Sequence, residues 1–321
     1  MTMTKPKIGL YWCSSCGGCE ESVVDLAEDI LTVVGAVDIV FWPVALDFKY
    51  EDVKNLADGE LAAVLINGSV RMDEQEDIAR LLRQKATAVL AYGSCAHLGG
   101  VTGLGNFYNG RDLLDTAYRN IETVRNPEGV VPQPVSANGS GDLHLPNFYH
   151  TVKPLDQVID VDYYVPGCPP PPALLLNAVT ALLEGKLPPK GTVLAEPTAL
   201  CSTCPRRDSK PEKLHHAEFK RIYEVQVDPE KCFLEQGIIC TGPVTRGGCE
   251  ARCINANIPC RGCFGPLDGV IDQGAKFLSM LATDFAANDV DGIDRIIASI
   301  PDPAGLFYRY NLAASQLRGK K

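Results

Sequence analysis

Hydrophobic runs of strand length alternate with helix-length amphipathic segments over the first 185 residues. Five runs rich in Val, Ile and Leu predict strands at 7–12, 37–44, 61–66, 87–92 and 161–165. Apolar positions recur at helical spacing over three further segments, 20–34, 72–84 and 174–184. Strands that are apolar throughout and alternate with helices indicate a parallel sheet covered on both faces. We therefore expect a three-layer α/β domain.

The rest of the chain departs from this alternating pattern and predicts two further domains. Periodicity is weak over 106–160, which we expect to be a long excursion from the sheet, and Pro-Pro-Lys-Gly at 188–191 marks a boundary. We expect a flavodoxin-like domain over 1–187, a cysteine-rich domain with little regular structure over 188–266, and a helical C-terminal extension over 267–321. Because secondary-structure signals are poor in the middle domain, we expect metal rather than a hydrophobic core to organise it. The basic end, 309–321, predicts an exposed tail or docking arm.

Charge excludes some classes of partner, and the cysteines suggest a class of chemistry. Thirty basic and forty acidic residues give a formal net charge of -10, so we expect no nucleic-acid or membrane binding. No run approaches the roughly 20 apolar residues of a membrane helix, and no signal-peptide pattern is present, which favours the cytoplasm. Thirteen cysteines are many for a compartment in which disulfides are disfavoured. Such cysteines more often bind metal or perform redox chemistry.

Three groups of cysteines follow predicted strands. Cys13, Cys16 and Cys19 follow the first, Cys95 the fourth and Cys168 the fifth. The carboxyl ends of parallel strands meet at one edge of a sheet, where ligands bind. Four thiolates there can hold a [4Fe-4S] cluster. From the first group we choose Cys16 and Cys19, which adjoin the start of a helix, and expect Cys13 to be a small packed residue.

The second half of the chain contains eight more cysteines, enough for two sets of four. They are Cys201, Cys204, Cys232, Cys240, Cys249, Cys253, Cys260 and Cys263. Two zinc sites are an alternative to two iron-sulfur clusters. Zinc ribbons, however, usually pair two C-x2-C knuckles across 15 to 20 residues, and the two knuckles here are much farther apart. Sequence reasoning favours iron-sulfur and leaves zinc open.

The motifs around these cysteines resemble the small, electron-transferring subunit of [NiFe] hydrogenases. The resemblance rests on Cys16-Gly-Gly-Cys19-Glu20, Gly93-Ser-Cys95, Gly167-Cys168-Pro-Pro, Cys240-Thr-Gly-Pro-Val-Thr-Arg-Gly-Gly-Cys249 and Cys260-Arg-Gly-Cys263-Phe-Gly-Pro266. The last two are typical of the cytoplasmic, group-three branch. The stretch from Asp272 to Lys276 resembles the methyl-viologen-reducing type that works with heterodisulfide reductase.

The resemblance implies three [4Fe-4S] clusters, each with four cysteine ligands. They are a proximal cluster at Cys16, Cys19, Cys95 and Cys168, a distal-type cluster at Cys201, Cys204, Cys232 and Cys240, and a medial-type cluster at Cys249, Cys253, Cys260 and Cys263. Cys253 stands where periplasmic relatives often have Pro and a three-iron cluster. The resemblance also implies a [NiFe] site in a separate large subunit, and electron transfer to a further iron-sulfur subunit and to heterodisulfide reductase.

Several alternatives belong beside this interpretation. Close relatives of the same type are deazaflavin-reducing hydrogenases and NAD(P)-linked sulfhydrogenases. The related cluster subunit of respiratory complex I typically lacks a second cysteine-rich domain, and a zinc-organised scaffold would have no redox function.

Asn67 stands at a strand end that is often Glu in relatives, so we assign it no acidic role. Basic residues beside the cysteines either offset cluster charge or form solvated surface; they are Arg206, Arg207, Lys231, Arg246, Arg252 and Arg261.

Overall fold

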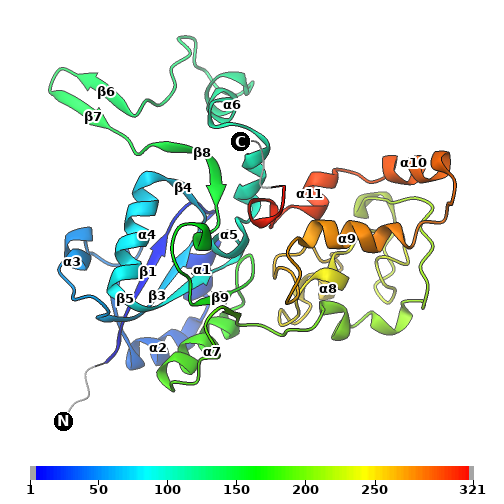
Figure 1. The fold of residues 1–321 in the computed structure, drawn as a ribbon, viewed down its shortest axis with the longest axis horizontal. Coiled ribbons are helices and arrows are strands. Elements are labelled where there is room, and N and C mark those ends of the chain that lie inside the picture. The colour runs from blue at the N-terminus through cyan, green and yellow to red at the C-terminus, as the bar shows by residue number, and fades with distance from the viewer. Residues whose placement is uncertain (1–4, 318–321) are drawn as a thin grey trace.

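A six-stranded parallel sheet forms the centre of the N-terminal lobe in this computed structural model, which describes residues 5–317 (Figure 1). The strand order is β10-β9-β5-β3-β1-β2. The strands are β1 (Lys7–Trp12), β2 (Asp38–Phe41), β3 (Leu61–Asn67), β5 (Ala86–Tyr92), β9 (Tyr163–Val165) and β10 (Thr192–Val193). The flavodoxin-like α/β fold and all five expected strands are confirmed. The sixth strand, β10, adds an edge to the sheet just beyond residue 191.

Side chains that alternate along the strands build a core on each face of the sheet. Ala63 and Leu65 pack with the helices on one face, and Val64 and Ile66 pack with those on the other. The first face is covered by α1 (Gly18–Val24), α2 (Ile30–Ala36) and α7 (Pro172–Leu183). The second is covered by α3 (Tyr50–Lys54) and α4 (Asp73–Lys85). The expected three layers are therefore present.

The first expected helix, over 20–34, is interrupted. It is divided into α1, a short 3-10 turn η1 (Ala27–Asp29) and α2. Ala27 has a left-handed φ of 51°, which an α-helix does not accommodate. Apolar residues on both sides of the break still face the sheet, at Val23 and Val33, which explains why the periodicity continues across it.

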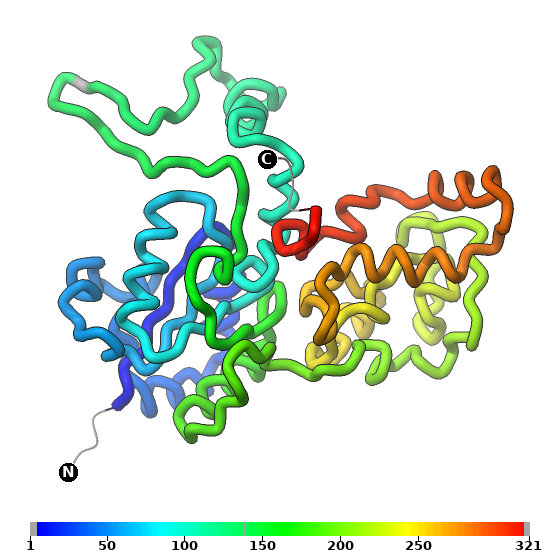
Figure 2. Tube along the Cα trace, in the orientation of Figure 1, coloured from blue at the N-terminus to red at the C-terminus, as the bar shows by residue number. Residues whose placement is uncertain are grey.

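The excursion over 106–160 contains more regular structure than its weak periodicity predicts. It holds α6 (Gly110–Asp115), the hairpin β6 (Val135–Asn138) and β7 (Gly141–His144), and β8 (Phe148–Lys153). Strand β8 pairs antiparallel with β4 (Val70–Met72) and ties the end of the excursion to the sheet lobe. The hairpin projects away from the rest of the molecule (Figure 2).

The second lobe contains all eight later cysteines and has its own hydrophobic core, contrary to the expectation of metal alone. The core combines Phe233 and Ile238 from the cysteine-rich segment with Phe277, Leu281 and Phe307 from the C-terminal helices. Those helices are α9 (Gln273–Ala282), α10 (Val290–Ala298) and α11 (Pro303–Phe307). The cysteine-rich segment itself has little regular structure beyond α8 (Arg252–Asn255) and short 3-10 turns, as expected. Because one core joins them, the segments 188–266 and 267–317 fold against each other.

The basic end of the chain, expected to be an exposed tail, is instead largely packed against the rest of the protein. After α11 the chain returns to the sheet lobe, where Leu312, Ala313 and Ser315 in and beside η9 (Leu312–Ala314) are buried. The Gln157 side chain donates a hydrogen bond of 3.1 Å to the carbonyl of Ala313. The segment is therefore packed between the lobes rather than exposed, although residues 318–321 of the expected tail lie outside the described residues (Figure 1).

Candidate metal centre

The first cysteine group lies at the carboxyl edge of the sheet, beyond the ends of β1, β5 and β9. Cys16 is exposed just before α1, and Cys19 is buried in its first turn. Cys95 is buried in α5 (Ser94–Leu98), directly after β5, and Cys168 follows β9. The Ser94 amide donates to the Gly167 carbonyl at 2.7 Å and joins the last two loops. The structure thus brings together the four thiols that the sequence predicts.

Burial and mutual repulsion oppose ionisation of these thiols. Burial raises the pKa of Cys19, and the neighbouring thiols of Cys95, Cys168 and Cys16 raise it further. Burial and Cys168 raise the pKa of Cys95 to about 11. A bound cationic iron centre supplies the positive charge that would hold such thiols as thiolates.

Two glycines bring the backbone close to the sulfur atoms of this group. A Cβ atom on Gly93 would lie 2.4 Å from the Cys19 sulfur, and one on Gly100 would lie 2.3 Å from the Cys95 sulfur. Both glycines have left-handed φ angles, which other residues rarely adopt. Glycines let the backbone approach the thiols closely, which fits a bulky sulfur-ligated group. The donor set, four cysteine thiols, is that of a [4Fe-4S] cluster.

Cys13 lies apart from this group. It is 5% exposed, packs in the core on the α4 face, and burial raises the pKa of its thiol to about 12. Its amide donates to the Asn67 carbonyl at 2.8 Å. These contacts agree with the expectation of a small packed residue.

Glu20 is a buried acid that the sequence analysis names within a motif but to which it assigns no role. Its carboxylate accepts hydrogen bonds from the Trp42 indole and, at 2.5 Å, from the Asn67 amide. Burial raises the pKa of Glu20, and these two hydrogen bonds partly oppose that rise. Asn67 therefore contributes a donor rather than an acid, and the carboxylate is supplied from the next element. The position of Glu20 directly after Cys19, on the inward side of α1, was the sequence feature that could have indicated a buried acid here.

The second group contains three mutually close thiols and a fourth beside them. Burial and then the charges of Cys204 and Cys232 raise the pKa of Cys201 to about 12. A Cβ on Gly242 would lie 3.2 Å from the Cys201 sulfur and 3.6 Å from that of Cys240, so both sulfurs flank this glycine. Cys240 is fully enclosed, and burial, followed by Cys260, holds its pKa well above the ordinary value. Cys240 thus lies between the second and third groups.

The third group contains Cys249, Cys253, Cys260 and Cys263. Helix α8 presents Cys253 at the surface close to Cys249. Burial holds the pKa of Cys263 well above its usual range, and the charges of Cys260, Cys168, Cys253 and Cys249 add to the rise. The hydroxyl of Thr241 donates to the Cys260 sulfur at 3.6 Å. Cys263 therefore faces its own group and also Cys168 of the first.

The thiols of each group are neighbours, but they do not converge on a single point. Within the part of the chain that the structure describes, no three His, Cys, Asp or Glu side chains are placed to share a single metal ion. A four-iron cluster takes one thiolate at each iron instead.

The basic residues beside the cysteines divide into two kinds. Arg206 and Arg246 are buried, Arg261 is half-buried, and Arg207, Lys231 and Arg252 are exposed. Arg206 lies over the Phe233 ring at 4.1 Å and donates to Asn257 at 2.6 Å. Only the buried guanidinium groups sit where solvent screens their charge weakly.

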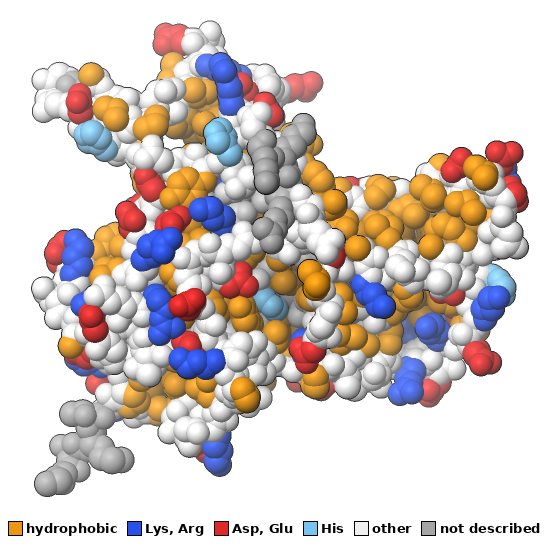
Figure 3. Space-filling model, in the orientation of Figure 1, with side chains coloured by type: hydrophobic (Ala, Val, Ile, Leu, Met, Phe, Trp, Pro, Cys, Tyr) orange, Lys and Arg blue, Asp and Glu red, His pale blue; other side chains and the backbone are white. Residues whose placement is uncertain are grey.

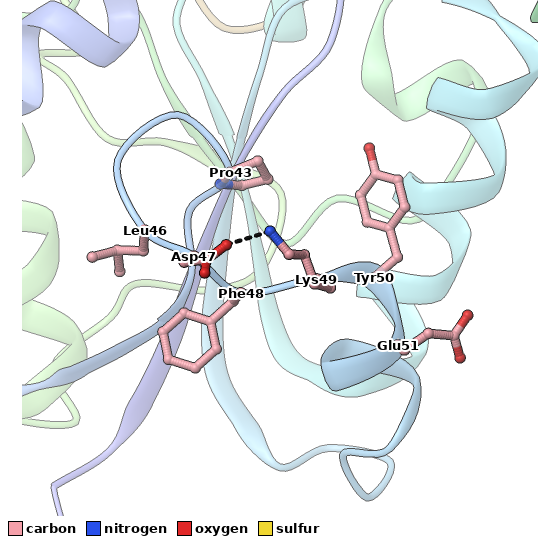
Figure 4. Close-up of a pocket in the computed structure, with 7 residues that line it drawn as sticks. All are labelled: Pro43, Leu46, Asp47, Phe48, Lys49, Tyr50 and Glu51. Carbon is pink, nitrogen blue, oxygen red and sulfur yellow. Dashed lines mark hydrogen bonds and ion pairs between the residues drawn. The ribbon is translucent and has the colours of Figure 1, made fainter.

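An apolar surface borders the first cysteine group at the ends of β1 and β2. The Trp12 ring lies against Gly17, the residue that separates Cys16 from the start of α1. Val44, Leu46 and Phe48 are exposed on the loop that follows β2. The loop after β2 forms a shallow pocket in which Leu46 and Phe48 flank the ion pair of Asp47 and Lys49 (Figure 4). We call Trp12, Val44, Leu46 and Phe48 the edge surface.

Across residues 5–317, every helix is too short or too polar to cross a membrane.

Comparisons with known proteins agree with this geometry. The family described as "NADH ubiquinone oxidoreductase, 20 Kd subunit" matches residues 16–182, the part that contains the first cysteine group. An iron-sulfur subunit of the F420-non-reducing hydrogenase from Archaeoglobus profundus is 39% identical over 317 residues, which cover 98% of each chain. A subunit of the F420-non-reducing hydrogenase vhu from Methanococcus voltae is 37% identical over 319 residues, 99% of each chain.

Solved structures show the same fold. A chain of the [NiFeSe] hydrogenase from Desulfovibrio vulgaris Hildenborough superimposes with a TM-score of 0.54 at 18% identity. The match covers 84% of this chain and 96% of that one, so it extends beyond the sheet lobe. Together with the two full-length relatives, these findings place the chain in the family of F420-non-reducing hydrogenase iron-sulfur subunits, the hydrogenase partners that lack the catalytic centre.

Proposed function

We propose that this chain is the electron-transfer subunit of its hydrogenase and holds three [4Fe-4S] clusters. The ligands are Cys16, Cys19, Cys95 and Cys168 at the proximal site, Cys249, Cys253, Cys260 and Cys263 at the medial site, and Cys201, Cys204, Cys232 and Cys240 at the distal site. When bound, the clusters supply reversible one-electron storage.

The observation that carries the proposal is the continuity of the three cysteine groups. The hydroxyl of Ser94, beside Cys95 of the proximal group, donates to the carbonyl of Cys263 in the medial group at 2.5 Å. The amide of Thr241, beside Cys240 of the distal group, donates to the carbonyl of Cys260 in the medial group at 3.1 Å. The three sites therefore form a row from the sheet edge into the second lobe, which is the arrangement that electron transfer through a protein needs.

The residues around each site control access and charge. Buried apolar side chains keep water from the thiols of Cys240 and Cys260, and the hydroxyl of Thr241 and backbone amides donate to cysteine sulfurs. Such donors and the local exclusion of water set the reduction potential of a cluster.

The [NiFe] site that splits hydrogen belongs, in this proposal, to a large subunit that covers the edge surface. Trp12, Val44 and Phe48 leave apolar area exposed beside the proximal group, as an unoccupied protein interface does. A large subunit seated there would have its active site next to the first cluster of the row.

Electrons leave from the other end of the row. Cys201, Cys204 and Cys232 are partly exposed, so the distal site is open to a further iron-sulfur subunit. Exposed apolar residues on the same lobe, Leu278, Val290 and Ile297 on α9 and α10, provide a docking surface (Figure 3). We propose heterodisulfide reductase as the final acceptor and the cytoplasm as the location, a compartment in which disulfides are disfavoured and cysteines remain available as ligands.

The alternatives differ in the electron acceptor. The full-length relatives are named as F420-non-reducing enzymes, which disfavours a deazaflavin acceptor. A delta subunit of sulfhydrogenase 2 from Pyrococcus furiosus is 25% identical over 260 residues, so an NAD(P)-linked complex is the second candidate.

Iron, sulfide and zinc content, with EPR of the dithionite-reduced chain purified without oxygen, tests the proposal. Three clusters give about twelve irons per chain and interacting reduced-cluster signals. Stoichiometric zinc with little iron and no EPR signal would instead establish the zinc-organised scaffold.

A further inference from the structure

The loop that carries Cys95 meets the second lobe through one side chain. Helix α5 lies on the side of the sheet lobe that faces the second lobe (Figure 1). Its first residue, Ser94, directly precedes Cys95 and is 1% exposed. The Ser94 hydroxyl lies 2.5 Å from the carbonyl oxygen of Cys263 and 2.8 Å from that of Gly167. Ser94 therefore lies between the cysteine loops of the proximal and medial groups.

The Ser94 hydroxyl has one proton and two carbonyl neighbours, and the backbone decides between them. The Gly167 carbonyl already accepts a hydrogen bond from the Ser94 amide at 2.7 Å. The Cys263 carbonyl is the nearer of the two, and across the described residues no backbone amide donates to it. We therefore assign the hydroxyl proton to Cys263, because this gives each carbonyl a donor.

Other contacts hold the two lobes together independently of this hydroxyl. The C-terminal segment that follows α11 accepts a hydrogen bond from the Gly100 amide at 3.0 Å, at the carbonyl of Tyr310. It accepts another from the Gln157 side chain at 3.1 Å, at the carbonyl of Ala313. Within the described chain, by contrast, no backbone hydrogen bond joins residues 93–100 to residues 260–265. Loss of the Ser94 hydroxyl should therefore leave the lobes docked and loosen only the contact between the two cysteine loops.

The next junction along the row is built in a similar way. Thr241 directly follows Cys240 of the distal group and is 4% exposed. Its hydroxyl donates to the carbonyl of Cys260 in the medial group at 3.1 Å, and its amide donates to the same carbonyl at 3.1 Å. At both junctions, a buried hydroxyl residue beside a ligand of one group bonds to the carbonyl of a ligand of the next.

We infer that Ser94 is a positioning residue for electron transfer between the proximal and medial clusters. This inference rests on the proposed function. The hydroxyl holds Cys263 against the loop of Cys95 and completes a path of covalent bonds and one hydrogen bond between the two ligands. Electron transfer slows steeply as the gap between two centres widens, and bonded atoms carry it better than a gap in the packing. Because the hydroxyl bonds to a carbonyl and not to a sulfur, it sets the rate of this step rather than the potential of either cluster.

Ser94→Ala tests this role because it removes the hydroxyl and keeps the amide bond to Gly167. We expect reduction of the medial cluster by hydrogen to become several-fold slower, with iron content and all three potentials unchanged. The measurement is freeze-quench EPR of the full chain with its co-purified subunits, after mixing with hydrogen-saturated buffer. Cys95→Ser and Cys253→Ser each change a proposed ligand of one cluster and identify the proximal and medial signals.

Ser22→Ala is the matched control. Ser22 is also 1% exposed, and its hydroxyl donates at 2.8 Å to the carbonyl of another proposed ligand, Cys19, within the sheet lobe. We expect this variant to leave the rate of medial reduction unchanged. Ser94→Thr keeps a hydroxyl at the junction and should reduce its medial cluster as fast as the unchanged chain does.

The outcomes separate this inference from the function on which it rests. An unchanged rate in Ser94→Ala, or an equal loss of rate in Ser22→Ala or Ser94→Thr, overturns the role of the hydroxyl. So does a slower rate that comes with a lost cluster or a shifted potential. In each of these cases, three clusters in the unchanged chain still support the proposed function. A chain without four-iron clusters removes the proposed function and the inference together.

Discussion

At the scale of single residues, position 93 requires glycine for two reasons, its backbone conformation and the cysteine sulfur beside it. Its φ of 89° and the nearby Cys19 sulfur both exclude a side chain. We predict that Gly93→Ala loses the proximal cluster, so that iron falls from about twelve to about eight per chain. Gly191→Ala is the control, because Gly191 has the same φ and nothing within 4 Å of a built Cβ. Equal iron loss in both variants would assign the effect to backbone strain alone.

A second prediction at this scale separates the spare cysteine from its neighbours. Cys16→Ala removes a proposed ligand and should lose one cluster. Cys13→Ala should keep all three, because Cys13 packs in the core, and should cost only about 1 kcal/mol of stability for the lost buried sulfur. Iron content and thermal unfolding of the two variants measure the difference. If Cys13→Ala lost a cluster and Cys16→Ala did not, the ligand choice would be reversed.

At the scale of elements, a sequence predicts structure that follows a repeating hydrophobic pattern, and it misses structure that depends on a single backbone angle or on contacts between distant segments. The strands were predictable because each is apolar on both faces, as in Ala63 to Ile66 of β3. The break between α1 and α2 was not, since Val23 and Val33 keep the helical period while one backbone angle at Ala27 changes. The return of the C-terminal segment was also missed, because its two basic ends conceal the short apolar run at Leu312 and Ala313.

That run gives a stability prediction for the C-terminal segment. Leu312 is 0% exposed between the lobes, whereas Leu317, five residues later, is 55% exposed. Leu312→Ala should cost about 2–5 kcal/mol, the usual range for a buried leucine, and lower the melting temperature by several degrees. Leu317→Ala should leave the melting temperature unchanged. Thermal unfolding of both variants, followed by circular dichroism, makes the comparison, and similar melting temperatures would contradict the packed position of the segment.

At the scale of the whole molecule, sequence reasoning reached the proximal group but not the connections beyond it. Cys95 and Cys168 could be placed beside Cys16 because parallel strands end at one edge. No periodicity relates Cys263 to Cys168, or Ser94 to Cys263, because those contacts depend on how two lobes pack. The hydrophobic core of the second lobe escaped prediction for the same reason, since part of it comes from later helices of the chain, at Phe277, Leu281 and Phe307.

The arrangement of the lobes also predicts which face of the molecule binds which partner. Phe48 is 39% exposed on the edge surface beside the proximal group, and Val290 is 74% exposed on α10 in the other lobe. A charge buried without a partner in an interface opposes binding strongly. Phe48→Glu should therefore sharply reduce co-purification of the large subunit with the tagged chain, while Val290→Glu should leave it intact. Both substitutions are at exposed positions, so three clusters should remain in each. Loss of the large subunit from Val290→Glu, with retention by Phe48→Glu, would place the catalytic partner on the second lobe and reverse the direction of the row.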